Sequence, residues 1–267
     1  MHPILFELGP ITFYSYGVLL AAAYLIGLQL ALVRSRSRGL DQQRVMDLGI
    51  WIIVSALAGA KLLLFLVDYR QYLANPRELG NLLRSGGVFY GGLIAGVGVA
   101  LWYIHRHRMP LWTTTDVFAP GIALGHVVGR LGCLMAGCCF GRPTSMPWAI
   151  TFRDPAANSN VPLGVPLHPT QLYEAGAEAV ILMLLLALER RSGDFPGRTF
   201  WTYMLLYGIS RFGIEFYRGD SRGMILGAVS TSQFVSLVVV PLAGAMLLRL
   251  GGRSGGTPHG AARRAAA

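Results

Sequence analysis

The sequence is poor in charged residues. Asp, Glu, Lys and Arg make up 13% of its 267 residues, whereas a typical soluble domain carries about 25%. Hydrophobic residues account for 53% of the chain, and its mean hydropathy is +0.49. This composition argues against a soluble domain and indicates an integral membrane protein.

Acidic residues are scarcer than basic ones, 13 against 23, which gives a formal net charge of +10. Such an excess can mark a nucleic-acid-binding protein, but here the basic residues form short clusters between apolar runs. That pattern is typical of cytoplasmic membrane loops and of contact with anionic lipids. We therefore expect membrane lipids, and no nucleic acid, as partners.

Cysteine is also scarce, and its three occurrences all fall within residues 133–139. A disulfide framework would spread cysteines along the chain. Cys133 could bridge Cys138 or Cys139 in an oxidising compartment, or a small thiol could pack against neighbouring glycines. A nucleophilic cysteine is a third, less supported possibility. The spacing is not a standard zinc pattern and lacks a fourth ligand, so we predict no metal site.

Lysine occurs once, as Lys61, inside the second apolar run. A single intramembrane lysine in a seven-helix protein raises the possibility of a retinal-type Schiff base. That interpretation is weak here, because the lysine lies in the second run and no acidic counter-ion stands beside it. A contact with an anion or a structural partner is favoured.

Apolar runs of the length that a bilayer requires occur seven times. They predict an all-α integral membrane protein with seven transmembrane helices. The N-terminus lacks the basic stretch of a cleavable signal, so we expect the first run to persist as a helix. The predicted spans are approximately 14–33, 46–67, 88–104, 112–128, 172–188, 199–212 and 225–248.

The placement of arginine sets the expected orientation. Arginine clusters follow the first, third, fifth and seventh spans, and the positive-inside rule makes those loops cytoplasmic. The N-terminus is then outside, the C-terminus is cytoplasmic, and segments 129–171 and 213–224 lie on the outer side. We predict one transmembrane domain over residues 1–250 and a disordered cytoplasmic tail over 251–267, which is rich in small residues.

The most unusual stretch is 121–142, where an apolar helix runs into a polar, cysteine-bearing segment. Gly121, Gly125 and Gly129 recur every four residues, which predicts a groove where a neighbouring helix approaches closely. Arg130 follows in the same stretch, and Arg142 lies a short way beyond it. An arginine at membrane depth is costly unless it has an anionic partner or lines a wet cavity. The stretch therefore predicts a pocket for an anion within the membrane, such as a phospholipid headgroup.

A second unusual stretch, 85–96, is rich in glycine and contains Tyr90. Glycines here allow close backbone approach or a break in the helix, and would present Tyr90 at a packed site. The plainer interpretation is a glycine-packed helix start, with Tyr90 in the interfacial aromatic belt.

A charged stripe follows the sixth span. At 100° per residue, Tyr207, Arg211, Glu215 and Arg218 share one helix face, and Arg211 and Glu215 stand at ion-pair spacing. The stripe is either an interfacial salt-bridge network or a functional site, since ionisable residues in membrane segments are usually functional.

The segment 166–174 enters the fifth span. Thr170 is a candidate N-cap of that helix. Glu174 either orients an arginine or only favours the helix N-terminus. His168, between two prolines, is expected to be structural, because no second histidine stands at ligand spacing.

Taken together, these motifs resemble those of the prolipoprotein diacylglyceryl transferase family. The resemblance runs from Tyr16 to Arg218, in the order and with the seven-span topology of that family. It rests on Tyr-Gly-Gly-Leu-Ile-Ala-Gly (90–96), Gly-Arg-Leu-Gly (129–132), Gly-Arg (141–142), His-Pro-Thr-Gln-Leu-Tyr-Glu (168–174), and the Tyr207, Arg211, Glu215 and Arg218 stripe.

The resemblance implies that the diacylglyceryl group of phosphatidylglycerol moves to the lipobox cysteine thiol of a secreted prolipoprotein at the bacterial inner membrane. The product is a thioether, glycerol-1-phosphate leaves, and no metal or organic cofactor is required. The leaving phosphate gains charge that Arg130 and Arg211 could stabilise. The candidate catalytic residues are Tyr90, Arg130, Arg211 and Glu215, and the candidate substrate-binding residues are Tyr16, Lys61, Gly91, Gly92, Gly141, Arg142, Glu174, Tyr207 and Arg218.

The chain departs from the family signature at three positions. It has Tyr90 where the family has a histidine, Cys133 where it has an asparagine, and Cys138 where it has an acidic residue. The proton of the thiol would then go to a tyrosinate held near arginine or to the leaving phosphate, or else the activity differs. The alternatives are a related membrane enzyme with another acceptor and a non-enzymatic lipid-binding or transport bundle.

Overall fold

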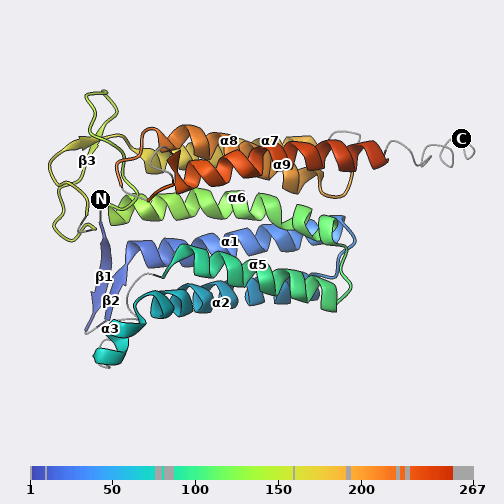
Figure 1. Cartoon of the computed structure of the whole chain (residues 1–267), viewed down its shortest axis with the longest axis horizontal. Helices are drawn as coiled ribbons and strands as arrows, with labels where there is room; N and C mark the ends of the chain where they lie inside the picture. The colour runs from blue at the N-terminus through green and yellow to red at the C-terminus, as the bar shows by residue number, and fades with distance from the viewer. Residues whose placement is uncertain are drawn as a thin grey trace, which may run out of the picture. The chain divides into compact units, whose positions relative to one another are not determined.

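The structure, a computed structural model, describes residues 2–9, 11–75, 80, 87–158, 160–190, 194–220, 223–225 and 229–254 (Figure 1). Its helices are α1 (Ser15–Ser37), α2 (Gln42–Val67), α3 (Tyr69–Ala74), α5 (Phe89–Arg106), α6 (Leu111–Ala136), α7 (Thr170–Glu189), α8 (Arg198–Glu215) and α9 (Thr231–Ser254). The chain divides into two compact units, one formed by Met1–Ala31 with Thr115–Ala267 and the other by Leu32–Thr114.

A long helix stands at each of the seven predicted spans. Five of the described helices are long and apolar enough to cross a membrane: α1, α2, α6, α7 and α9. These helices agree with an integral membrane protein. The helix that carries Arg130 is longer than predicted, because α6 continues past residue 128 to Ala136. Gly129 and Gly132 do not end it, because a glycine inside a helix costs only about 1 kcal/mol relative to alanine.

Three short antiparallel hairpins were not predicted. They pair β1 (Ile4–Leu8) with β2 (Ile11–Tyr14), β3 (Ile150–Thr151) with β4 (Pro166–Leu167), and β5 (Met224–Ile225) with β6 (Val229–Ser230). The β3–β4 pair joins residues far apart in sequence, since Ile150 pairs with Leu167, 17 positions later. Strands this short show almost no periodicity, so no sequence pattern predicts them.

In the first unit, α1 and α6 pack through bare backbone. A Cβ built on Gly121 would lie 2.4 Å from the carbonyl oxygen of Gly27, and one on Gly125 would lie 3.2 Å from that of Ala23. The predicted groove is therefore confirmed at these two glycines. At Gly129, by contrast, a Cβ would meet no atom within 4 Å.

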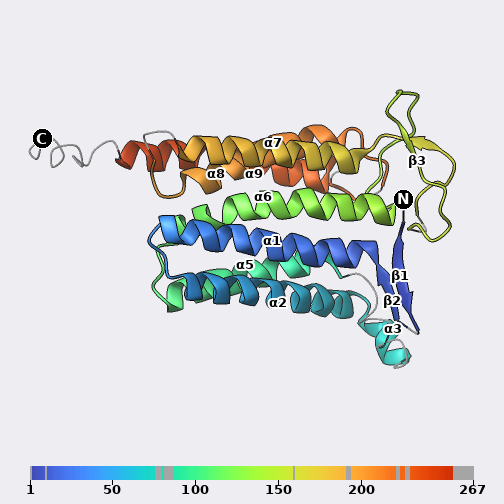
Figure 2. The ribbon, with the colours of Figure 1, turned by 180° about the vertical axis from the view of Figure 1, so that it is seen from behind.

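Helices α6, α7, α8 and α9 of the first unit lie side by side (Figures 1 and 2). Their apolar core includes Ala119, Ile181, Leu185 and Tyr203. The carboxylate of Asp116 on α6 accepts hydrogen bonds from the backbone of Gly197 and Phe200 at 2.6 and 2.8 Å. A side chain from α6 thus satisfies the free N–H groups at the start of α8 and fixes where that helix begins.

The second unit is built on the pair α2 and α5. A Cβ on Gly59 of α2 would lie 2.5 Å from the carbonyl oxygen of Gly91, and one on Gly91 of α5 would lie 2.4 Å from that of Gly59. The N–H of Val88 donates to the carbonyl of Ala60 at 3.0 Å, just before α5 begins. The glycines of the 85–96 stretch, from Gly87 onward, therefore allow two helix backbones to touch. Ser85 and Gly86 lie outside the described residues, as does the tail from residue 255.

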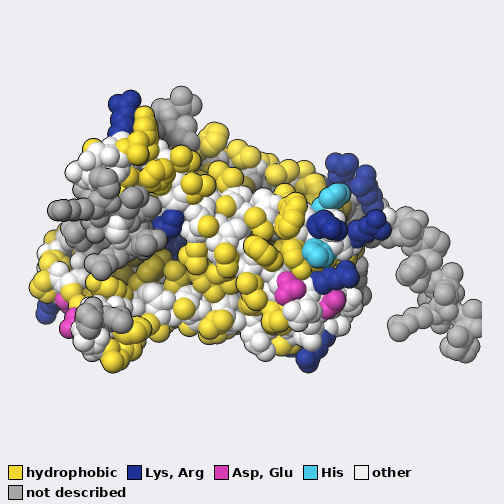
Figure 3. All heavy atoms as spheres, turned by 90° about the horizontal axis from the view of Figure 1, so that it is seen from below, with side chains coloured by type: hydrophobic (Ala, Val, Ile, Leu, Met, Phe, Trp, Pro, Cys, Tyr) yellow, Lys and Arg dark blue, Asp and Glu magenta, His cyan; other side chains and the backbone are white. Residues whose placement is uncertain are grey.

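Figure 3 shows a face whose middle is covered by apolar side chains, with Lys, Arg and His gathered at one end. Exposed His105 and Arg106 end α5, and Arg44 near the start of α2 pairs with Asp41 at 3.5 Å on the surface. An apolar surface bounded by a cluster of basic residues is typical of a membrane protein at the edge of the bilayer.

Candidate active site

Glu174, near the start of α7, is the centre of a buried ion-pair cluster in the first unit. Its carboxylate lies 2.6 Å from the guanidinium of Arg130 on α6 and 2.8 Å from that of Arg218, which follows α8. Only 4% of Glu174 is exposed. The prediction that Glu174 orients an arginine is therefore confirmed, and the cluster joins segments 44 to 88 residues apart in sequence, which no local pattern could show.

Arg211 and Glu215 on α8 belong to the same cluster. They pair at 2.7 Å with i, i+4 spacing, as predicted, and both are buried. The second terminal nitrogen of Arg211, Nη1, is buried and has no hydrogen-bond partner among the described residues. It lies 3.8 Å from Glu174, too far for a hydrogen bond, and Arg211 borders a small cavity between α7 and α8. Arg211 thus has a buried donor without a hydrogen-bond partner and lines a small cavity.

Arg218 was predicted to share the helix face of Arg211 and Glu215. That prediction is wrong, because α8 ends at Glu215. Arg218 instead extends from the following turn and holds Asp220 with two hydrogen bonds, of 2.8 and 2.6 Å. Burial opposes its charge, but the hydrogen bonds to Asp220 together with the negative charges of Cys139, Glu174 and Asp220 outweigh this and raise the pKa of Arg218 above its ordinary value. Arg218 therefore stays charged.

Within the cluster, three guanidinium groups face three carboxylates. Arg130, Arg211 and Arg218 are balanced by Glu174, Glu215 and Asp220. Each buried charge thereby has a partner, as low-dielectric surroundings require. An incoming anion would use the free donor of Arg211 and compete with Glu174 for its arginines.

A second contact between α6 and α7 lies one helical turn from the first. His126 Nδ1 is 2.7 Å from the Glu178 carboxylate and 3.0 Å from the hydroxyl of Tyr203 on α8. Sequence reasoning missed Glu178 and Tyr203 as members of this site. A signal was present, since Glu178 follows Glu174 by four residues inside an apolar run, and Tyr203 precedes Tyr207 by four.

Gly141 and Arg142 form a backbone contact with the turn that carries Arg218. A Cβ on Gly141 would lie 2.5 Å from the carbonyl oxygen of His168 and 2.8 Å from that of Tyr217, so only glycine fits there. The N–H of Arg142 donates to Tyr217 at 2.8 Å, and its side-chain Nε donates to the carbonyl of Arg218 at 3.0 Å. The predicted substrate residue Arg142 thus lies beside the buried cluster and is itself exposed.

The end of α6 brings the three cysteines together, with their sulfur atoms within 4.8 Å of one another and none in a disulfide. Of the alternatives that the sequence left open, the disulfide is therefore not formed in this structure. Hydrogen bonds from Cys133 and Cys138, and the charges of Arg218 and Arg130, hold the pKa of Cys139 below its ordinary value although burial opposes this.

The segment after the cysteines is tied to the start of α7. Thr170 Oγ1 donates to the carbonyl of Cys139 at 2.8 Å, and Gln171 Nε2 donates to that of Cys138 at 2.7 Å. Thr170 is the first residue of α7 and Pro169 is its N-cap, so the predicted capping role of Thr170 is wrong. The hydroxyl holds the cysteine turn instead of the helix end.

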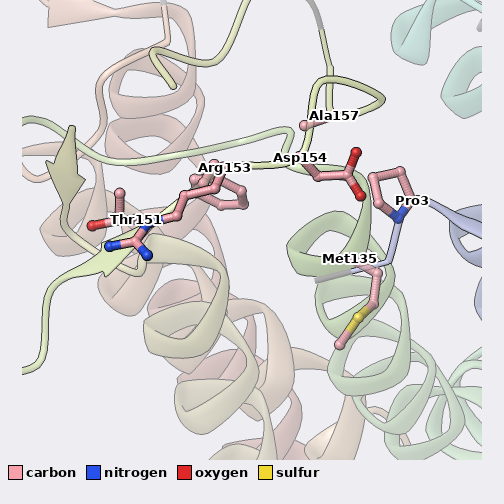
Figure 4. A pocket seen from close by; sticks show the side chains of 7 residues that line it. Pro3, Met135, Thr151, Arg153, Asp154 and Ala157 are labelled. Carbon is pink, nitrogen blue, oxygen red and sulfur yellow. The ribbon is translucent and has the colours of Figure 1, made fainter. Parts of the chain in front are cut away.

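A larger cavity, of about 420 Å³, lies beside the C-terminal end of α6 (Figure 4). In Figure 4 the Asp154 carboxylate points toward Pro3, and the Arg153 guanidinium extends toward Thr151. The lining of this 420 Å³ cavity contains none of the residues of the buried ion-pair cluster. The lining residues are Pro3, Met135, Thr151, Phe152, Arg153, Asp154 and Ala157.

The remaining candidates are placed as follows. Tyr207 lines the small cavity with Arg211. Tyr16, on α1, lies against α6, because a Cβ built on Gly132 would be 3.4 Å from its ring. Tyr90, Lys61, Gly91 and Gly92 all lie in the second unit, where Tyr90 is in the first turn of α5 and 43% exposed. Their substrate and catalytic roles stay predictions.

Comparison with known proteins identifies the family. The family description "Prolipoprotein diacylglyceryl transferase" matches residues 3–249. The chain belongs to this family. It is 36% identical over 241 residues to the phosphatidylglycerol–prolipoprotein diacylglyceryl transferase of Clostridium tetani. The aligned region covers 90% of this chain and 94% of the relative.

Two further relatives carry the same name. A second transferase of Clostridium perfringens is 33% identical over 249 residues, with 93% of this chain and 94% of the relative covered. That of Bordetella bronchiseptica is 34% identical over 256 residues, with 92% and 93% covered. The family that the motifs suggested is therefore confirmed. Its members are transferases by name, and the buried cluster contains five of the residues on which that prediction rested: Arg130, Glu174, Arg211, Glu215 and Arg218.

Proposed function

We propose that this protein transfers the diacylglyceryl group of phosphatidylglycerol to the lipobox cysteine thiol of secreted prolipoproteins. The sulfur attacks the glycerol carbon, the bond between that carbon and the phosphate oxygen breaks, and the bonding electrons leave with glycerol-1-phosphate. The thiol proton goes to a base or to the leaving phosphate. The reaction is alkyl transfer, so it requires stabilisation of a phosphate leaving group and no acyl-enzyme.

The observation that carries this proposal is the buried donor of Arg211. A guanidinium nitrogen without a hydrogen-bond partner borders a small cavity that Glu174 and Tyr207 also line. Leaving such a donor unsatisfied is costly, which favours a site built to receive an acceptor group. A phosphate oxygen is a strong acceptor, and its growing charge in the transition state strengthens the contact.

We place the protein in the bacterial inner membrane with seven transmembrane helices. The N-terminus would be outside, the C-terminus cytoplasmic, and the ion-pair cluster at the outer side. The arginine clusters at the ends of α1, α5 and α9 support this orientation by the positive-inside rule. The secreted precursor would then meet the lipid on the side to which it is exported.

The test of the proposal is a reaction with defined components. Purified protein in detergent, supplied with phosphatidylglycerol and a lipobox peptide, should yield a diacylglyceryl-peptide that mass spectrometry detects. The same peptide with its cysteine replaced by serine should yield none. Binding of phosphatidylglycerol without any product would favour the alternative of a lipid-binding or transport bundle. Lipid turnover with an unmodified peptide would indicate another acceptor.

The anion site is tested by Arg130→Ala and Arg211→Ala. Each should lower turnover about 10²-fold or more, because a developing phosphate charge loses its partner. The fold should survive in Arg130→Ala, since Glu174 keeps Arg218 at 2.8 Å. Arg44→Ala, which removes a surface arginine, is the matched control and should leave turnover unchanged. Near wild-type activity in both cluster variants would refute the site.

The protein's own cysteines are expected not to act as nucleophiles, because the acceptor peptide brings the reacting thiol. Replacing all three with Ala should therefore retain turnover in protein that folds. Detection of a lipid thioether on Cys133, Cys138 or Cys139 would overturn this expectation.

A further inference from the structure

The three cysteines are held together by the way in which α6 ends. The N–H of Cys138 donates to the carbonyl of Cys133 at 3.1 Å, and that of Gly137 donates to Leu134 at 3.3 Å. Gly137 has φ +71°. These are the bonds and the left-handed residue of a Schellman motif, which places the side chains of Cys133 and Cys138 next to each other.

Cys139 reaches the same point at a conformational cost. Its φ is +62°, one of two positive values among the described non-glycine residues. A residue with a Cβ pays about 1–2 kcal/mol for this conformation, which glycine would adopt freely. Strained residues of this kind gather at functional sites and ligand clamps. The strain turns the third sulfur toward the other two, within 4.8 Å of both.

The backbone of the cysteine turn is fixed from a second side as well. The carbonyl groups of Cys138 and Cys139 accept hydrogen bonds from Gln171 and Thr170, both at the buried start of α7. The thiols are thus positioned by α6 and by α7 before any ligand arrives. This arrangement is not explained by apolar packing alone, because apolar packing would not require a cysteine in the left-handed conformation.

We propose that Cys133, Cys138 and Cys139 form a binding site for a soft d¹⁰ cation, with Cu(I) as the best fit. Thiolate ligands select such ions, Cu(I) and Zn(II) among them. At a metal–sulfur distance of about 2.3 Å, a trigonal ion separates its sulfurs by about 4 Å, which the present arrangement allows. Among the described residues, no His, Asp or Glu joins the group as a fourth ligand. A structural zinc site usually has four protein ligands, so three thiolates favour an ion that accepts trigonal coordination.

The charges around the turn fit this ion. Three thiolates with Cu(I) carry a net charge of −2, and Arg130 and Arg218 place two positive charges near Cys139. The ion would join the end of α6 to the segment that continues to Gly141 and Arg142. This site is independent of the proposed transfer reaction, which needs no metal.

The test uses the full-length protein in detergent with a thiol-free reductant, titrated against the coloured Cu(I) complex of bicinchoninate. The protein should withdraw one equivalent of Cu(I) per chain, and X-ray absorption should show three sulfur neighbours. Each of Cys133→Ser, Cys138→Ser and Cys139→Ser should weaken binding at least 100-fold. Met135→Leu, which removes a nearby thioether, should bind like the wild type. A parallel titration with Zn(II) distinguishes the ions, and tighter binding of Cu(I) than of Zn(II) is expected.

Cys139→Gly separates loss of the ligand from loss of the fold. Without the ion it should unfold at a temperature equal to or above that of the wild type, because the left-handed strain is removed. With Cu(I) the wild type should gain thermal stability and this variant should not. The proposal is overturned if the wild type withdraws no more Cu(I) than the triple serine variant. It is also overturned if thiol titration without reductant finds one free cysteine instead of three, since a disulfide would then be the resting state.

Discussion

Two helix interfaces in this protein differ in the groups that they bury. In the first unit, α6, α7 and α8 meet around buried charges, with Glu174 between Arg130 and Arg218. In the second unit, α2 and α5 approach each other through the backbones of Gly59 and Gly91. Desolvating the charged groups of the first interface costs free energy, whereas the glycine contact of the second interface has no such cost.

The difference indicates where function lies. Burying an ion pair rarely stabilises a fold more than apolar packing of similar volume would. The cluster of three arginines and three carboxylates is therefore the candidate binding site, and Nη1 of Arg211, which has no hydrogen-bond partner among the described residues, supports this assignment. The glycine contact, by contrast, brings two helices close and needs no ligand to be satisfied.

The largest effect should come from removing the centre of the charged interface. Glu174→Ala leaves Arg130 and Arg218 buried without their shared carboxylate, which should lower the free energy of unfolding by about 3–5 kcal/mol. Thermal or denaturant unfolding in detergent measures it. Asp41→Ala is the matched control, because it breaks an exposed pair with Arg44 that is worth about 1 kcal/mol or less. Equal losses in the two variants would show that the cluster carries no buried charge.

The next effect tests whether the second unit contributes chemistry as well as packing. Tyr90→Phe removes only the hydroxyl, so the glycine contact stays intact. If that hydroxyl acts as a base, turnover should fall about 10²-fold while phosphatidylglycerol binding is retained. Tyr90→His, which restores the family residue, should keep partial activity.

If Tyr90→Phe turns over normally across neutral pH, the hydroxyl of Tyr90 has no role in the chemistry. Tyr90 would then be an aromatic belt residue, and the proton would go to the leaving phosphate or to water. The two units would in that case divide cleanly, with chemistry in the first and packing alone in the second.

The sequence predicted the parts of this protein that local patterns determine. Apolar runs located seven helices, and the i, i+4 spacing of Arg211 and Glu215 predicted their ion pair, which is confirmed. The position of Glu174 suggested a partner arginine but could not say which one. That choice depends on how α6, α7 and α8 pack, so the contacts with Arg130 and Arg218 could be seen only in three dimensions.

The failures have the same cause. The helical periodicity placed Arg218 on α8, although the helix ends three residues earlier and the side chain reaches Glu174 from a turn. The sequence also did not show that the three cysteine sulfur atoms lie together. The left-handed conformation of Cys139 is not encoded in any local pattern, and it is what brings the third sulfur to the other two.

The smallest effect concerns the glycine interface, and two glycines of α5 make it a matched pair. In Gly91→Ala the new Cβ would lie 2.4 Å from the Gly59 carbonyl oxygen and 2.5 Å from the Leu63 Cβ, so α2 and α5 must move apart. Such overpacking should lower the free energy of unfolding by about 1–3 kcal/mol. In Gly98→Ala the new Cβ meets nothing within 4 Å, so the better helix propensity of alanine should raise stability by about 0.5–1 kcal/mol. A lower unfolding temperature for Gly91→Ala and a higher one for Gly98→Ala would show that backbone contact holds this interface. Equal, small changes in both variants would show that the helices are free to separate there.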